Sequence, residues 1–216
     1  MKNEYVEKFR KFLCKVQNGV LPMERQTDAW GEYNKEFTIT QIKSFKLATQ
    51  VEFRNLKILD VGCGLCDALD IFVQEGAKAI GIALSQRDVA IGKEKGHDVY
   101  FMDQSFMDFE DDTFDIVWSK HCLEHSFMPA FTLSEYYRVM KPNAYLYVEV
   151  PAPQTVLNHQ NNPEHFSVFT KACWASLFKR AGFELHSYTD IKFKIMTKEG
   201  GFDLYYAFIL KRGNVV

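Results

Sequence analysis

The residues best equipped for chemistry lie in the segment KHCLEHS, from Lys120 to Ser126. It contains His121, Glu124 and His125 in an H-x-x-E-H pattern, which also occurs in a class of zinc peptidases. On a helix, residues four positions apart share a face, so the two histidines would be placed to bind one metal ion. The elements around the segment decide whether this interpretation holds.

A second chemical pattern is the pair Cys63 and Cys66, a single C-x-x-C. No second pair follows, so the sequence does not indicate a zinc ribbon. The chain has 5 cysteines, an odd number, and their spacing contains no disulfide framework. We therefore expect a protein of a reducing compartment, the cytoplasm.

Composition and charge exclude several functional classes. The formal net charge is -2, so no basic excess favours nucleic acid as a partner. The amino-terminal sequence alternates charged and apolar residues, and no apolar run approaches membrane-spanning length, so we expect neither a signal peptide nor a membrane anchor. A length of 216 residues suits one core with additions rather than two independent domains.

Short apolar runs alternate with helical patterns from residue 56 onward. Runs that are apolar on both faces and separated by helices indicate a parallel sheet buried between helical layers. We therefore predict a three-layer, doubly wound α/β sandwich. The predicted strands are 56–61, 78–84, 98–102, 114–119, 144–150, 183–195 and 202–212, and the predicted helices include 86–95, 129–140 and 170–181.

Two details extend this prediction. A glycine-containing turn at 198–201 separates the last two strands, so we expect them to pair antiparallel. The helix over 129–140 is expected to turn Ala130, Leu133, Tyr137 and Met140 inward as one stripe.

The first 50 residues look helical and are interpreted as an amino-terminal helical cap, 1–50, on a Rossmann-like domain, 51–216. Within that cap, Trp30, Tyr33 and Phe37 are expected to pack on the open end of the sheet or over a pocket.

The segment LDVGCGLCDALD, residues 59–70, reads as a strand, a G-x-G turn and the start of a helix. Glycines there let the backbone approach a ligand closely, next to the N–H groups of the helix. A dinucleotide site would have a third glycine where Asp67 stands and an acid at the end of the next strand, where Ala83 and Leu84 stand. The sequence therefore misses two requirements of a nicotinamide cofactor site.

Five segments in this order resemble the successive motifs of class I S-adenosylmethionine-dependent methyltransferases: DVGCG (60–64), GIALS (81–85), MDQSF (102–106), FDIVWSKHCLEH (114–125) and YRVMKPNAYLYVEVP (137–151). Each motif alone is loose, but their order and spacing match from about residue 54 to 190. The resemblance implies a seven-stranded, mostly parallel sheet with an antiparallel last strand. It also implies S-adenosyl-L-methionine as the cofactor, and methyl transfer to an oxygen or nitrogen of a small or medium acceptor.

The resemblance further implies roles for individual residues. The glycine turn would lie under the amino-acid part of the cofactor, and Asp103 would accept a hydrogen bond from the adenine amine, with Gln104 and Ser105 at the edge of the ring. Ser119, Lys120 and His121 would line the site near the methyl group. The residues predicted to bind the cofactor are Asp60, Gly62, Cys63, Gly64, Ala83, Leu84, Gln86, Asp103, Gln104, Ser105, Ser119 and Lys120.

Two positions depart from the family pattern. Cys66 stands where the family has its third glycine, so the turn is expected to be wider or strained. Ala83 replaces the acid that takes the ribose hydroxyls, and each lost charge-assisted hydrogen bond is worth roughly 1.5–3 kcal/mol. Gln86 or Asp88 is the candidate substitute, although Ser85-x-x-Asp88 reads as a capping box with Ser85 as N-cap, which favours capping for Asp88.

The family resemblance also accounts for the histidines. Its members commonly carry a histidine after the fourth strand, whereas a zinc peptidase would place the motif within a long helix that Pro129 here precludes; we therefore predict no metal site. If the acceptor is a hydroxyl or an ammonium, a base must remove its proton. His121 and His165 are the candidate catalytic residues, although His165 also suits a loop-bracing hydrogen bond. Glu149 is expected to face the site, because a buried acid needs a partner.

The alternatives stay open at this point. His125 is compatible with capping or packing, and His159 with a solvated loop position. A non-catalytic binding protein that kept the fold is the alternative function, and Ala83 and Cys66 are the features that support it. No motif encodes the acceptor or the oligomeric state.

Overall fold

The computed structural model describes Glu7, Lys11 and residues 31–195 and 200–213. The chain divides into two compact units, Met1–Glu32 and Tyr33–Val216. Helix α2 (Gly31–Thr49) therefore belongs, from Tyr33 on, to the unit that contains the sheet, whereas the sequence predicts a cap over 1–50. Trp30 and the side chain of Tyr33 lie outside the described residues, while Phe37 packs 5.6 Å from the ring of Phe193.

A seven-stranded sheet in the order β3-β2-β1-β4-β5-β7-β6 forms the centre of the second unit. Strands β1 to β5 run parallel to one another, and β7 pairs antiparallel with both β5 and β6. The predicted antiparallel pairing of the last two strands is confirmed. The strands are β1 (Lys57–Val61), β2 (Lys78–Ala83), β3 (Asp98–Phe101), β4 (Phe114–Lys120), β5 (Met140–Pro151), β6 (Phe183–Lys194) and β7 (Phe202–Arg212).

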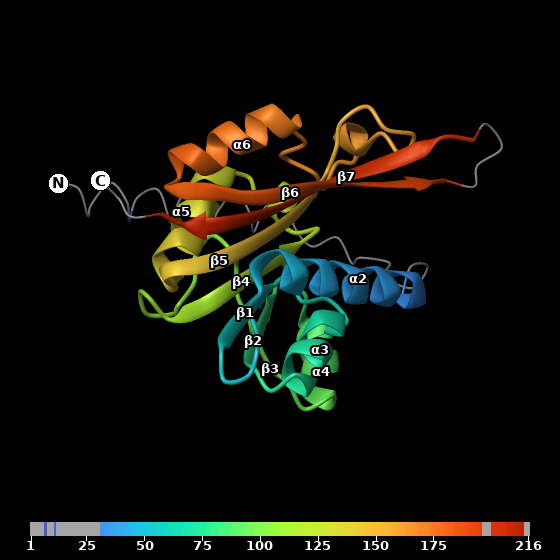
Figure 1. Cartoon of the computed structure of the whole chain (residues 1–216). Helices are drawn as coiled ribbons and strands as arrows, with labels where there is room; N and C mark the ends of the chain where they lie inside the picture. Colours follow the sequence, from blue (N-terminus) through green and yellow to red (C-terminus); the bar gives the residue numbers. More distant parts are fainter. Residues whose placement is uncertain (1–6, 8–10, 12–30, 196–199, 214–216) are drawn as a thin grey trace. The chain divides into compact units, whose positions relative to one another are not determined.

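Helices cover both faces of the sheet, so the predicted three-layer α/β sandwich is confirmed. Helices α2, α3 and α4 lie on one face, and α5 and α6 lie on the other (Figure 1). Within the described residues, the chain contains no helix with the length and apolarity that crossing a membrane requires. The helices are α3 (Asp67–Gln74), α4 (Gln86–Glu94), α5 (Pro129–Val139) and α6 (Lys171–Arg180), and two 3-10 turns are η1 (Leu123–His125) and η2 (His159–Asn161).

Two hydrophobic cores form because successive strand residues point to opposite faces. In β4, Val117 packs with the core under α5 and α6, whereas Trp118 packs with the core under α2 and α3. The Trp118 ring stacks on Tyr147 of β5 with ring centroids 3.8 Å apart and an interplanar angle of 7°. Phe45 of α2 meets Trp118 edge-on at 5.9 Å, which fixes this helix on the sheet.

The inward stripe of α5 differs from the prediction. Leu133 and Met140 are buried as expected, but Ala130 is exposed and Tyr137 is half-buried. The helix buries Tyr136 instead. The prediction placed the stripe one residue too far along at this turn, because adjacent tyrosines give no signal for which of them points inward.

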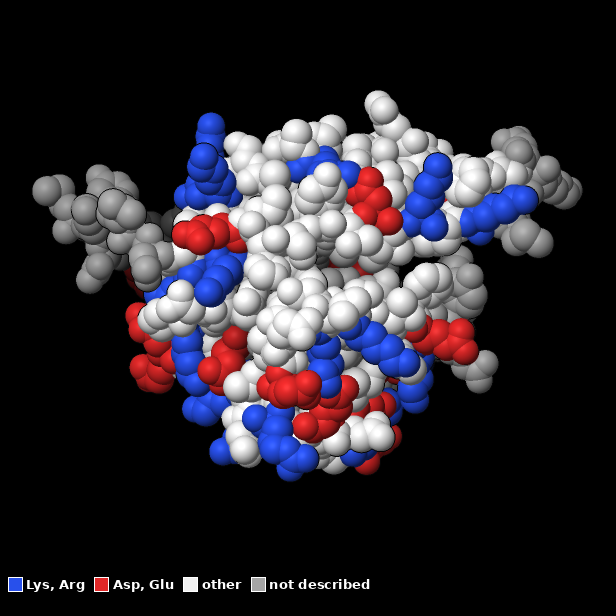
Figure 2. All heavy atoms as spheres, viewed as in Figure 1, with Lys and Arg blue, Asp and Glu red and all other residues white. Residues whose placement is uncertain are grey.

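Charged side chains are interspersed on the surface. On the face seen in Figure 2, lysines and arginines alternate with aspartates and glutamates, and no extended field of one sign is present on that face among the described residues.

Candidate functional site

The carboxyl ends of the central strands bring polar residues into two adjacent rows. Asp60 of β1, Trp118 of β4 and Tyr147 of β5 are in register with one another. Two residues further toward the carboxyl ends, Lys120 of β4 pairs with Glu149 of β5. Parallel sheets bind ligands at this edge, where the loops that follow the strands meet.

The turn after β1 contains two glycines, Gly62 and Gly64, whose surroundings differ. Both have positive φ, 72° at Gly62 and 49° at Gly64, which glycine adopts without steric cost. A Cβ on Gly62 would lie 2.6 Å from Sγ of Cys122, so the loop after β4 requires glycine here. A Cβ on Gly64 would meet nothing nearer than the Gly62 carbonyl at 4.0 Å. The turn is therefore open to a ligand at Gly64, and closed by protein at Gly62.

The cysteines of the turn lie beneath it. Cys66 adopts a left-handed conformation with φ 66° where α3 begins, which is the strain expected from the absence of glycine there. Cys63 and Cys66 are both buried, and contact with Cys66 together with burial raises the pKa of the Cys63 thiol. Cys63 is thus a protonated packing residue and not a nucleophile.

Asp60 is a buried acid under the same turn, with only 3% of its surface exposed. Burial raises its pKa to about 7, and Asp67 adds to the effect, while the positive charge of Lys120 opposes it. Asp60 therefore titrates near neutral pH, at a position where a ligand cation would favour its ionised form.

The end of β2 matches the capping prediction. Ser85 is the N-cap of α4, and its Oγ accepts a hydrogen bond from the backbone N–H of Asp88 at 3.2 Å. Ala83 is buried, whereas Leu84 and Gln86 are exposed. Ribose contact by Gln86 stays a prediction.

The loop after β3 presents Asp103 and turns its neighbours inward. Oδ1 of half-buried Asp103 accepts a hydrogen bond from the N–H of Ser105 at 2.8 Å. The side chain of Gln104 is buried, where its Nε2 donates to the carbonyl of Cys122 at 3.0 Å and its Oε1 accepts from Tyr136 at 2.6 Å. Ser105 Oγ lies 2.8 Å from the hydroxyl of Thr132. The side chains of Gln104 and Ser105 are therefore already engaged within the protein, and only their backbones could contact an adenine ring.

Ser119 and Tyr136 continue this buried network. Ser119 is fully buried in β4, and its Oγ lies 3.1 Å from the Tyr136 hydroxyl. Burial raises the pKa of Tyr136, so the phenol stays neutral. The network joins the loop after β3 to the end of β4. In the sequence, Tyr136 is marked only as an aromatic residue within a predicted helix.

His121 and Glu149 form the most conspicuous pair of the site. His121 Nε2 lies 2.7 Å from Oε1 of Glu149, a close contact that is not a well-aligned hydrogen bond. The carboxylate is buried and also accepts a hydrogen bond from the Tyr147 hydroxyl at 2.6 Å. The His121 backbone has φ 52°, an uncommon conformation for a residue with a Cβ. Glu149 is therefore buried with partners, and the expectation that it faces the site stays a prediction.

The two groups shift each other's protonation. Desolvation and the charge of Lys120 lower the pKa of His121 below its usual 6.5, against an opposing effect of Glu149. Burial would raise the pKa of Glu149, but His121, Lys120 and Tyr147 outweigh it, and the net pKa lies below the usual range. At neutral pH the pair is a carboxylate beside a neutral imidazole, 35% exposed, that can accept a proton.

A second histidine–carboxylate pair lies next to the first and was not foreseen. His159 is buried, and its Nε2 lies 3.0 Å from each oxygen of Asp203, an acid of β7 with 0% exposure. Burial would raise the pKa of Asp203, but His159, Thr155 and the backbone of Leu204 together outweigh it, and the net pKa lies below the usual range. Tyr205 links both pairs, because its ring lies 4.4 Å from that of His121 and 5.1 Å from that of His159. In the sequence, this pair is indicated only by Asp203, an isolated acid in the apolar run FDLYYAFIL.

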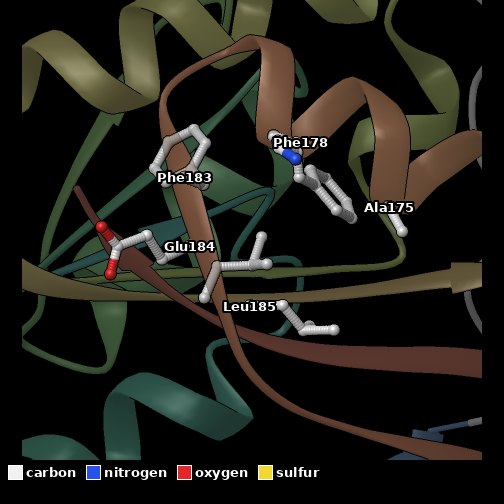
Figure 3. Close-up of a pocket in the computed structure, with 7 residues that line it drawn as sticks. Ala175, Phe178, Phe183, Glu184 and Leu185 are labelled. Atoms are coloured by element: carbon white, nitrogen blue, oxygen red, sulfur yellow. The ribbon is translucent and has the colours of Figure 1, made fainter. Parts of the chain in front are cut away.

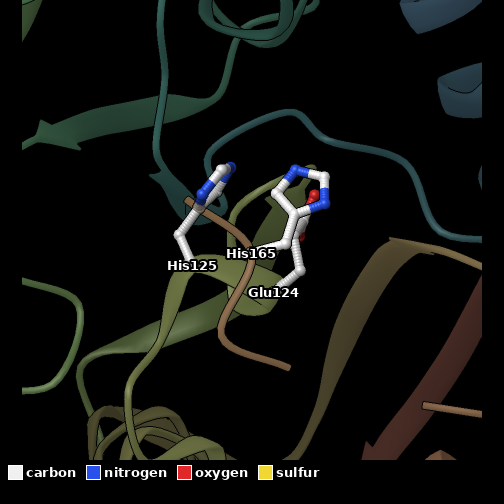
Figure 4. Close-up of side chains that lie close together, drawn as sticks. All are labelled: Glu124, His125 and His165. Atoms are coloured by element: carbon white, nitrogen blue, oxygen red, sulfur yellow. The ribbon is translucent and has the colours of Figure 1, made fainter. Parts of the chain in front are cut away.

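The H-x-x-E-H segment does not form a helix that carries both histidines on one face. His121 turns toward Glu149, and the following residues form the 3-10 turn η1. His165, from the loop after β5, takes the place that His121 would have had, beside Glu124 and His125 (Figure 4).

Two surface hollows lie away from this edge. One, of about 380 Å³, is formed by apolar side chains of α6 and of the start of β6, with Phe178, Phe183 and Leu185 around it and the carboxylate of Glu184 pointing aside (Figure 3). The other, of about 450 Å³, lies where β1, β2 and β3 begin, at the opposite edge of the sheet, and includes Lys57, Lys78 and Asp98. Neither contains a residue predicted to act in catalysis or cofactor binding.

Comparison with known proteins agrees with this arrangement. The chain is 24% identical over 198 residues to the ubiquinone biosynthesis O-methyltransferase of Saccharophagus degradans, covering 81% of this chain and 83% of that protein. It is 27% identical over 120 residues to the sterol 4-C-methyltransferase strm-1 of Caenorhabditis elegans, covering 52% of this chain and 36% of that protein, so it spans little more than a third of that relative.

A solved structure is also similar. The S-adenosylmethionine-dependent methyltransferase from Archaeoglobus fulgidus superposes with a TM-score of 0.63 at 21% identity, covering 85% of this chain and all of that one. The sequence profile of the family described as "methyltransferase domain" matches residues 31–188. The chain therefore belongs to the methyltransferase-domain family and has the class I fold of S-adenosylmethionine-dependent methyltransferases.

Proposed function

We propose that this protein transfers the methyl group of S-adenosyl-L-methionine to a hydroxyl oxygen of a small or medium acceptor. The observation that carries the proposal is the neutral His121 imidazole held by buried Glu149 at the carboxyl edge of the sheet, next to the open glycine turn. An oxygen acceptor is preferred over nitrogen because the relative matched over most of its length is named an O-methyltransferase.

The residues around the turn fit the cofactor. The open side of Gly64 leaves room for the amino-acid part, and buried Asp60 suits its ammonium group. Asp103, at the end of β3, has the carboxylate that would accept a hydrogen bond from the adenine amine. Gln86, exposed at the start of α4, is the candidate for the ribose role that Ala83 does not serve.

The cofactor supplies a methyl group on a sulfonium, which is already activated for displacement. The chain's part is to align the acceptor and exclude water. His121 would take the acceptor's proton on Nδ1, because Nε2 faces Oε1 of Glu149 at 2.7 Å and carries the hydrogen that points to that carboxylate. The acceptor oxygen would bond to the methyl carbon as the C–S bond breaks and its electron pair goes to sulfur. The products are the methyl ether, the thioether and a protonated His121, which Glu149 stabilises at 2.7 Å.

Binding of S-adenosylhomocysteine, followed by calorimetry, tests the donor half of the proposal. We expect saturable binding by the folded protein; a folded sample with no binding at millimolar ligand would remove the proposal. Labelled S-adenosyl-L-methionine, screened against hydroxylated and amino acceptors, tests the other half. Donor binding with no transfer to any acceptor would favour the non-catalytic alternative, and transfer to amines alone would move the acceptor atom to nitrogen.

The wider setting is also a proposal. The mixed charges of Figure 2 and the net charge of -2 support a small-molecule acceptor over nucleic acid. The cytoplasmic location inferred from the cysteines stays a prediction.

A further inference from the structure

Two imidazoles and one carboxylate converge beside the His121 pair. One ligand atom from each of Glu124, His125 and His165 lies within 4.8 Å of the others. Figure 4 shows the three side chains extending in the same direction, two from the turn after β4 and His165 from the loop after β5. Such a set is typical of sites that bind a borderline divalent metal and leave other coordination positions open.

Backbone hydrogen bonds hold the two segments together. The N–H of Ser167 donates to the carbonyl of Glu124 at 3.0 Å, and Ser167 Oγ donates to the carbonyl of Ser126 at 3.3 Å. Ser167 thus bonds the residues on either side of His125, although the two segments are about 40 residues apart in sequence. The approach of His165 to Glu124 is thus a built feature of the fold and not a chance orientation of one exposed side chain.

The tautomer of His125 suits a metal ligand. Its Nδ1 lies 2.8 Å from the carbonyl oxygen of Glu164. Because a carbonyl can only accept, Nδ1 carries the hydrogen and donates, and the ring's lone pair is on Nε2. Metal-binding histidines usually donate their second ring N–H to a carbonyl or carboxylate in this way.

The other two side chains are also held in place. Glu124 is 1% exposed, and a carboxylate at such depth is usually paired or bound to a metal. The His165 ring stacks 5.6 Å from His159, which Asp203 anchors, and meets His125 edge-on at 4.9 Å. A site with ligands fixed before binding loses little side-chain entropy when the ion enters.

We propose that Glu124, His125 and His165 bind a divalent transition-metal ion of the Zn²⁺, Co²⁺ and Mn²⁺ class. The H-x-x-E-H segment contributes two of the three ligands. The sequence predicts no metal, because Pro129 precludes the long helix on which His121 and His125 would share a face. The fold instead brings His165, 40 positions from His125, beside Glu124 and His125. The existence of this site does not depend on methyl transfer.

Its role in the reaction rests on the proposed function. A series of ring contacts leads from His121 through Tyr205 and His159 to His165, so the cluster adjoins the place of the acceptor. An acceptor hydroxyl bound at an open position of the ion becomes more acidic. It then yields its proton to His121 more readily before its oxygen attacks the methyl carbon.

Cobalt binding tests the site itself. Metal-stripped protein is titrated with Co²⁺ in the absence of donor and acceptor, and binding is followed by visible absorption and by equilibrium dialysis. We expect stoichiometric binding to the wild type and its loss in Glu124→Gln and in His165→Asn. His186→Asn is the matched control, because His186 is an exposed histidine bonded to the Ala48 carbonyl, on another part of the unit.

Circular dichroism and thermal melts identify variants that fail to fold, and Glu124→Gln keeps the shape of the buried side chain. Absence of cobalt binding by the wild type would overturn the proposal, and so would unchanged binding in both folded variants. Because neither ligand of the methyl-transfer reaction is present, failure here leaves the proposed function standing. Failure to bind S-adenosylhomocysteine would, conversely, leave the metal site standing.

Discussion

The two halves of the carboxyl edge are built by different means. Around the ends of β1, β2 and β3, the candidate donor site consists of a glycine turn, a helix N-cap and side chains that are exposed or half-buried, such as Leu84, Gln86 and Asp103. Around the ends of β4 and β5 and the start of β7, the candidate acceptor site consists of buried histidine–carboxylate pairs, His121 with Glu149 and His159 with Asp203.

The difference follows from what each half would have to do. A donor of constant shape is recognised by a fixed backbone, which side-chain substitutions such as Ala83 leave intact. A side chain that takes up a proton during the reaction needs a pKa suited to that step. Burial and a paired charged group are what shift a pKa in this way. Variants in the donor half should therefore change cofactor affinity, and variants in the acceptor half should change the rate.

The largest expected effect is that of His121→Asn. Loss of a positioned base typically reduces the rate by about 10²–10⁴-fold. Asparagine tolerates the positive φ of this position better than most residues, so the fold is expected to persist. The turnover number with an active acceptor is measured alongside calorimetry with S-adenosylhomocysteine, and the affinity should not change. A large loss of affinity with an unchanged rate would reverse the assignment of the two halves.

The pH dependence sharpens this prediction. His121 accepts a proton only when neutral, and its pKa lies below 6.5. The wild-type rate at saturating substrates is expected to be level near neutral pH and to fall as pH drops through that lowered value. A rate that falls only above neutral pH would point to a group that must be protonated, and His121 would then not be the base.

Asp103→Ala is expected to weaken S-adenosylhomocysteine binding by about 10–100-fold, the value of a charge-assisted hydrogen bond of roughly 1.5–3 kcal/mol. The substitution also removes the acceptor of the Ser105 N–H bond. Asp103→Asn is the matched control, because it keeps an oxygen for that turn and removes only the charge. Intermediate affinity in Asp103→Asn and the loss of about 10–100-fold in Asp103→Ala would fit adenine contact. Equal affinity in all three proteins would exclude it.

A pair of glycine variants separates structure from ligand contact within the donor half. Gly62→Ala should cost about 2–5 kcal/mol of unfolding free energy, about 1–2 for positive φ and about 1–3 for the collision with Cys122. Gly64→Ala should cost about 1–2 kcal/mol, for φ alone. Denaturant melts give these values.

Calorimetry on the same proteins completes the pair. The methyl group of Gly64→Ala would project to the open side of the turn, where the cofactor is expected. Gly64→Ala should therefore weaken cofactor binding although it costs less unfolding free energy than Gly62→Ala. Equal unfolding free energies of Gly62→Ala and Gly64→Ala would show that the loop after β4 moves to accommodate a Cβ at position 62.

The sequence was informative about the donor half and the sheet, because both depend on local patterns. Strand periodicity, the G-x-G turn and the cap at Ser85 are each encoded within about ten neighbouring residues. The acceptor half was not encoded in this way. His159 meets Asp203 across 44 positions, and His165 meets Glu124 across about 40, and no local pattern reports such pairings. Tyr136 was missed for a related reason, since its hydroxyl partners lie on β4 and the loop after β3.

The smallest expected effect concerns Asp60, the one strongly tuned acid in the donor half. Its pKa of about 7 means that its ionised form is populated only as pH rises through neutrality. A cofactor ammonium binds that form better, so the affinity for S-adenosylhomocysteine should increase about five-fold across this interval, the difference between a charged and a neutral hydrogen bond of about 1 kcal/mol. Calorimetry at pH values on either side of 7 measures it.

Stability should move the opposite way. A raised carboxyl pKa means that the folded protein binds the proton more tightly than the unfolded chain, whose pKa is near 3.8. The contribution of Asp60 to the unfolding free energy is therefore lost as pH rises from that value to about 7. Asp60→Asn should flatten both profiles. If the affinity of the wild type is already flat, the donor half holds its ligand through the backbone alone, and the contrast with the acceptor half becomes complete.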